Sequence, residues 1–225
     1  MERSLSTEKK VVYEKKMNRL QEKLHQMGSL VEESIARSIQ ALKTQDLELA
    51  RGVIEGDEQV DRLELEIEEK CLEIIATQQP MARDLRRVAT LFKMISDLER
   101  MADYATDIAK ITLRIGHEPL IKPLMDIPRM AQLTQKMVKQ ALDAYVREDV
   151  DLAFAVGRDD DEVDQLHGQI FRELLMIMME NPRTISQATA LLFVSRWLER
   201  ISDHATNIAE EVVFLVTGDK KRLNE

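Results

Sequence analysis

Apolar residues recur every three or four positions along most of the chain, which is the pattern of amphipathic helices. Short breaks at Asp46, Gln79-Pro80, Asp149 and Asn181-Pro182 interrupt this period. The runs between them span about 10–44, 47–77 and 83–115 in the first half, and about 130–147, 150–179 and 184–217 in the second. The pattern predicts an all-α protein of long helices joined by short turns.

Two blocks of sequence occur twice. LERMADYATDIA (98–109) matches LERISDHATNIA (198–209) at eight of twelve positions, and ALKTQDLELARGVIEGDEQVD (41–61) matches AYVREDVDLAFAVGRDDDEVD (144–164) at eight of twenty-one. One glycine and three prolines separate the two copies within residues 116–128. We therefore expect two tandem antiparallel three-helix bundles, 1–115 and 130–225, joined by a linker at 116–129. Asp46 and Asp149 occupy equivalent places and should cap the helices that follow them.

Composition supports this interpretation. With 4% aromatic residues, 7 Gly and 5 Pro in 225 residues, a many-stranded sandwich or barrel is disfavoured. The net charge of −9 makes nucleic acid an unlikely partner. Neither an export signal nor a membrane-spanning apolar segment is recognisable, and the single cysteine, Cys71, fits a reducing compartment. We expect a soluble protein that is not exported.

Carboxylates form a repeated pattern beside the apolar face of the third helical run in each half. In the first copy the positions are Glu99, Asp103 and Asp107, and in the second Glu199, Asp203 and Asn207. The preceding runs carry pairs four residues apart, Asp57 with Asp61 and Asp160 with Asp164. Because residues four apart lie on one helix face, an antiparallel neighbour could bring two such pairs together.

Such crowding needs a physical reason, since each like-charge pair costs about 0.2–0.5 kcal/mol in an isolated helix. A bound cation would turn the net repulsion between the carboxylates into net attraction. Oxygen ligands without thiolates suit Mg²⁺, Ca²⁺, Mn²⁺ or ferric iron. The alternative is a solvated bundle surface on which Arg100 and Arg200 form ion pairs. The return of the pattern in both copies favours metal binding over that alternative.

Other motifs in the sequence indicate a function less clearly. Glu22-x-x-His25 occurs once, and Asp164-x-x-His167 is interpreted as a surface ion pair rather than a second di-iron half-site. Phosphate-binding loops, zinc spacings and a nucleophile with an identifiable base are not found in the sequence. Arg83, Arg86 and Arg87 form a basic cluster that is interpreted as solvated helix charge, with an acidic partner or phosphate as the alternative.

The repeated LERMADYATDIA and LERISDHATNIA motifs, together with ALKTQDLELARGVIEGDEQVD, resemble the PhoU family of bacterial phosphate-signalling regulators. The resemblance covers about residues 27–218. It implies two three-helix bundles related by pseudo-twofold symmetry, often as a homodimer, with metal clusters on E(D)-x-x-x-D motifs. The implied ion is iron, with zinc, manganese, magnesium or calcium as alternatives. The implied ligands are Glu99, Asp103, Asp107, Asp57 and Asp61 at one site, and Glu199, Asp203, Asp160 and Asp164 at the other, where Asn207 replaces a carboxylate.

The resemblance also implies a function without catalysis. Such an adaptor connects the ATPase of a phosphate ABC transporter to a sensor histidine kinase when phosphate is plentiful, and so represses phosphate uptake and phosphate-starvation genes. It would be cytoplasmic and reach the membrane through its partners, without inserting into it. Two other interpretations remain at this point: a carboxylate-bridged metal hydrolase or oxidase, and a helical scaffold that binds no metal.

Overall fold

The computed structural model describes residues 2–223, and side chains from residue 10 onward. Within these residues the chain forms seven α-helices and one 3₁₀ turn, without strands. The helices are α1 (Glu2–Thr44), α2 (Leu47–Gly56), α3 (Glu58–Gln78), α4 (Ala82–Ile115), α5 (Asp126–Arg147), α6 (Val150–Glu180) and α7 (Ile185–Thr217), and the 3₁₀ turn η1 is Pro182–Thr184. The predicted all-α class is confirmed.

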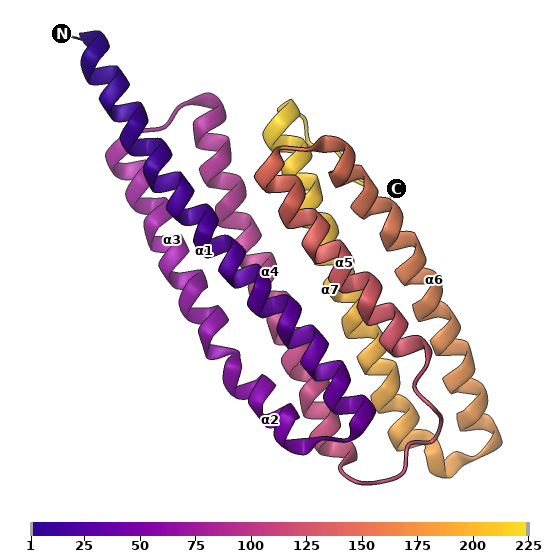
Figure 1. Cartoon of the computed structure of the whole chain (residues 1–225). Coiled ribbons are helices and arrows are strands. Elements are labelled where there is room, and N and C mark those ends of the chain that lie inside the picture. The colour runs from indigo at the N-terminus through magenta and orange to yellow at the C-terminus, as the bar shows by residue number, and fades with distance from the viewer. Residues whose placement is uncertain (1, 224–225) are drawn as a thin grey trace.

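The helices form two bundles that lie side by side along their length (Figure 1). The first contains α1, α4 and the α2–α3 pair, and the second contains α5, α6 and α7. The bundles meet where α4 packs against α7 and α1 packs against α5. This architecture of two repeated three-helix bundles is the predicted one. None of the helices in the described part of the chain is long and apolar enough to cross a membrane.

Repeat-equivalent aspartates cap the second helical run of each bundle. The Asp46 carboxylate accepts a hydrogen bond from the Leu49 backbone N–H at 2.9 Å, and Asp149 accepts one from Leu152 at 3.0 Å. Both caps have extended backbone, as a helix N-cap requires. The predicted role of these two residues is therefore confirmed.

Helix boundaries differ from the prediction in three places. The run expected at 47–77 is interrupted at Asp57, which separates α2 from α3. Gly56 precedes this break, whereas its repeat equivalent in the uninterrupted α6 is Asp159, and glycine is a poor helix former. Helix α1 begins at Glu2 rather than near residue 10, and α5 begins at Asp126 rather than 130. Pro128 lies in the first turn of α5, where a missing N–H costs no helical hydrogen bond.

One apolar core runs through both bundles. Equivalent residues of the third helices, such as Leu98 and Leu198, are fully buried, and Ala105 and Ala205 are buried beside them. Cys71 belongs to the same core, and its burial raises the pKa of its thiol to about 12. The thiol is therefore protonated and inert at neutral pH.

Polar contacts also join the bundles. His204 on α7 lies 2.8 Å from the Asp97 carboxylate on α4, measured from Nδ1 to Oδ1. The Arg87 guanidinium on α4 pairs with Glu14 on α1 at 3.3 Å and with Glu148, at the end of α5, at 3.7 Å. Arg83 also pairs with Glu148. Two of the three arginines interpreted as solvated charge therefore form ion pairs between the bundles.

Candidate functional site

Five carboxylates at the α2–α3 junction, on α3 and on α4 form the first acidic cluster, namely Asp57, Asp61, Glu64, Glu99 and Asp103. Asp57 immediately precedes α3, Asp61 lies in its first turn, and Glu64 follows one turn later. The charges of Asp61 and Asp103 act on Asp57, and those of Asp103, Glu64 and Asp61 act on Glu99. The antiparallel neighbour therefore brings the two predicted carboxylate pairs together.

Burial and mutual repulsion disfavour ionisation in the first cluster. Burial, followed by the Asp103 charge, raises the pKa of Glu99 to about 7. The pKa values of Asp57 and Glu64 are raised as well, again by burial first. Arg100 lies 3.0 Å from Asp103 and 3.4 Å from Glu99, and offsets part of this charge. The cluster still holds more carboxylates than cations.

The second acidic cluster, between α6 and α7, comprises Asp164, His167, Glu199 and Asp203, and Asp160 lies one turn before Asp164 on α6. Burial and then the Asp203 charge raise the pKa of both Asp164 and Glu199. Asp160 is buried, with 3% of its surface exposed. Arg196 forms an ion pair with one oxygen of Glu199. The other oxygen, Oε2, is buried and has no hydrogen-bond partner among the described residues.

The two clusters differ at one equivalent position. Under the 103-residue shift that aligns the repeats, Glu64 corresponds to His167. The His167 Nδ1 lies 3.1 Å from the Ser195 hydroxyl oxygen, and burial lowers the pKa of the imidazole, with a smaller effect of Arg196. His167 therefore belongs to the second cluster and is not the surface ion pair that the sequence suggested.

The outer members of the predicted sites have other partners. Asp107 pairs with Lys110 at 2.8 Å, and the Asn207 side-chain nitrogen lies 3.4 Å from the Asp97 carboxylate. The role of Asp107 and Asn207 as ligands stays a prediction.

In their present rotamers, no three Asp, Glu, His or Cys side chains of the described chain are placed to hold a metal ion. The chemistry that the clusters offer is a concentration of oxygen acceptors and negative charge, with one imidazole in the second. Glu64 and Arg196 were missed by sequence reasoning. The repeat shift and the helical period mark both positions, since Glu64 lies three residues after Asp61 and Arg196 three before Glu199.

A sequence model of the PhoU domain matches the chain twice, over residues 24–112 and 127–212. The chain belongs to the PhoU family. The resemblance seen in the sequence is thereby confirmed, and one matched stretch falls in each bundle. Each match contains one acidic cluster.

Curated relatives extend the match over nearly the whole chain. A PhoU homolog of Clostridium acetobutylicum is 40% identical over 215 residues, covering 95% of this chain and 98% of the relative. One from Caulobacter vibrioides is 43% identical over 209 residues, covering 92% and 91%. Both are named phosphate-specific transport system accessory protein PhoU homologs.

Two solved structures share the fold. The crystal structure of PhoU from Pseudomonas aeruginosa superimposes with a TM-score of 0.88 at 38% identity, covering 92% of this chain and all of that one. The phosphate transport system regulatory protein PhoU from Streptococcus pneumoniae gives a TM-score of 0.87 at 28% identity, covering 93% and 99%. The PhoU fold is therefore shared across distant sequences.

Proposed function

We propose that this PhoU-family protein is a non-enzymatic accessory regulator of a phosphate-specific transport system. When phosphate is plentiful it connects the transporter ATPase to a sensor histidine kinase, and so restrains phosphate uptake and phosphate-starvation genes. The observation that carries the proposal is about 40% identity, over nearly the full length, to relatives named as accessory proteins of that system. Such an adaptor acts in the cytoplasm and reaches the membrane through its partners.

Gene deletion tests the regulatory role. In phosphate-rich medium, cells that lack the gene should express phosphate-starvation genes, and a plasmid copy should restore repression. The matched control is the same plasmid carrying the gene with an early stop codon. Unchanged expression after deletion would contradict the proposal.

We further propose that the two acidic clusters bind metal ions. The donor set fits, because the carboxylates of both clusters are hard oxygen ligands and Glu199 holds a buried oxygen without a hydrogen-bond partner among the described residues. Asp57, Asp61, Glu99 and Asp103 would hold the ion of the first cluster. Asp160, Asp164, Glu199 and Asp203 would hold that of the second. A bound cation supplies the positive charge that offsets repulsion between these carboxylates.

Elemental analysis tests the metal proposal. Gently purified protein should contain stoichiometric iron, zinc, manganese or a similar ion, and a variant with Glu99, Asp103, Glu199 and Asp203 changed to Ala should not. Glu55→Ala, an exposed site on α2, is the control and should keep the metal. If the wild-type protein stays metal-free after incubation with these ions, the clusters are not metal sites, while the regulatory role is unaffected.

A further inference from the structure

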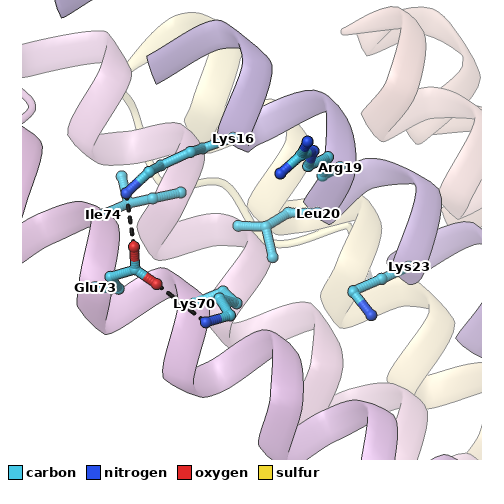
Figure 2. Close-up of a pocket in the computed structure, with 7 residues that line it drawn as sticks. All are labelled: Lys16, Arg19, Leu20, Lys23, Lys70, Glu73 and Ile74. Atoms are coloured by element: carbon cyan, nitrogen blue, oxygen red, sulfur yellow. Dashed lines mark hydrogen bonds and ion pairs between the residues drawn. The ribbon is translucent and has the colours of Figure 1, made fainter. Parts of the chain in front are cut away.

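A cationic groove lies between α1 and α3. It has a volume of about 280 Å³ (Figure 2). Its lining comprises Lys16, Arg19, Leu20, Lys23, Lys70, Glu73 and Ile74. Four cations and one carboxylate thus line this groove in a chain whose net charge is −9. The groove is a local reversal of the charge of the whole molecule.

The groove already holds a carboxylate of its own chain. Glu73 accepts hydrogen bonds from Lys16 at 2.7 Å and from Lys70 at 3.1 Å, so two lysines share one acid (Figure 2). Lys23 pairs with Glu66 at 2.8 Å, outside the lining. Arg19 is exposed and forms no ion pair with any side chain that the structure describes. Positive charge is therefore left over, most clearly at Arg19.

The repeated fold does not require this groove. Under the 103-residue shift, Lys23 corresponds to Asp126, where α5 begins, and Lys16 and Arg19 correspond to Pro119 and Lys122, which precede that helix. The first stretch matched by the PhoU domain model also begins only at residue 24. The α1 side of the groove is thus an addition to the duplicated unit.

Positive charge is concentrated in residues 1–23, which include the part of α1 that precedes the duplicated unit. Residues 1–23 contain seven Lys and Arg against four Glu, although acidic residues outnumber basic ones in the whole chain. In Figure 1 only the N-terminal end of α1 projects past the ends of the neighbouring helices, and the groove lies further along α1, beside α3. The Arg19 side chain is exposed there and is therefore accessible to another molecule.

We propose that the α1–α3 groove docks an acidic segment of a partner protein. The cations at 16, 19 and 23 lie on one face of α1 over about 10 Å, which suits successive carboxylates of an extended or helical segment. Leu20 and Ile74 are already buried, with 2% and 1% exposure, so the groove offers charge rather than apolar surface. Acidic groups are the complementary chemistry, and Glu73 shows how the lysines hold one. This inference rests on the adaptor function proposed above.

Binding measurements with charge variants test the docking site. The transporter ATPase and the cytoplasmic part of the sensor kinase, from the same genome, serve as probes for the full-length protein. Arg19→Glu should weaken binding of one probe by about tenfold. Lys43→Glu, an exposed site at the far end of α1, is the matched control and should leave affinity unchanged. Glu73→Gln should strengthen binding, because it releases Lys16 and Lys70 for the partner.

The sign of the Glu73→Gln effect separates docking from a structural role, since loss of an ion pair alone would not increase affinity. Circular dichroism should show equal helix content in all variants. If a probe binds and all variants have equal affinity for it, the groove is not its docking site, and the adaptor function is unaffected. If neither probe binds the wild type, both proposals fail. Arg19-dependent binding to phosphatidylglycerol vesicles, with protein binding unaffected, would overturn the proposal in favour of a membrane surface.

Discussion

Neutralising Glu99 should stabilise the metal-free protein. The Glu99 side chain keeps only 19% of its surface exposed, and its carboxylate is repelled by Asp103, Glu64 and Asp61. Burial and this repulsion raise its pKa from 4.5 to about 7. At about 1.4 kcal/mol per pKa unit, the full shift corresponds to about 3 kcal/mol of destabilisation at pH 8. Because water and salt screen part of the repulsion, we expect Glu99→Gln to raise the free energy of unfolding by about 1–2 kcal/mol.

The sign of the pH dependence follows from proton binding. Between pH 4.5 and about 7 the folded protein holds a proton on Glu99 that the unfolded chain releases. Stability therefore falls as the pH rises through this window and levels off above it. The gain from Glu99→Gln should shrink to about a quarter at pH 5.

Urea unfolding with a metal chelator present, at pH 5 and pH 8, measures this effect. Glu55→Gln, an exposed carboxylate on α2, is the control and should change stability little at either pH. A Glu99→Gln variant that is less stable than the wild type at pH 8 would refute the argument that Glu99 is destabilised by its neighbours.

Three further predictions concern the fold. Asp149→Ala removes a helix cap and should lower the free energy of unfolding in urea by about 1 kcal/mol, so an unchanged midpoint would contradict the capping role. Arg87→Met should cost about 1–3 kcal/mol in the same assay, because Glu14 and Glu148 lose a partially buried partner where the bundles meet. A loss below 0.5 kcal/mol, which is typical of surface substitutions, would show that the Arg87 ion pairs do not stabilise the fold. The buried Cys71 thiol should react with a chromogenic disulfide only in denaturant, and rapid labelling of the native protein would show that the core opens there.

The sequence carried most of the fold because its information is periodic and duplicated. Apolar spacing fixes which face of each helix is buried, and the shared shift aligns Asp46 with Asp149 as caps. The break at Asp57 was missed because the only local signal is Gly56, and a single glycine is tolerated inside many helices. The linker was predicted to extend to residue 129 because of Pro128, but proline is compatible with the first turn of a helix, and α5 begins at Asp126.

The candidate site was predictable only in part. Helical spacing identified the carboxylates on α3 and α4, but Glu64 and Arg196 were missed because the E-x-x-x-D pattern considers residues four apart and these lie three apart. The contact of His167 with Ser195 depends on how α6 faces α7, which periodicity within one helix does not specify. Likewise, the α1–α3 groove could not be predicted, because its lining depends on how α3 is rotated about its axis relative to α1.

Phosphate uptake by living cells tests the central claim most directly. Initial uptake of radioactive phosphate should be measured in phosphate-replete cells that lack the gene, carry it, or carry the variant with Glu99, Asp103, Glu199 and Asp203 changed to Ala. The account predicts faster uptake without the gene, restraint restored by the wild type, and no restoration by the variant despite normal helix content and abundance. Equal uptake with and without the gene would contradict the regulatory function. Full restoration of restraint by the variant would show that the regulation does not need the acidic clusters.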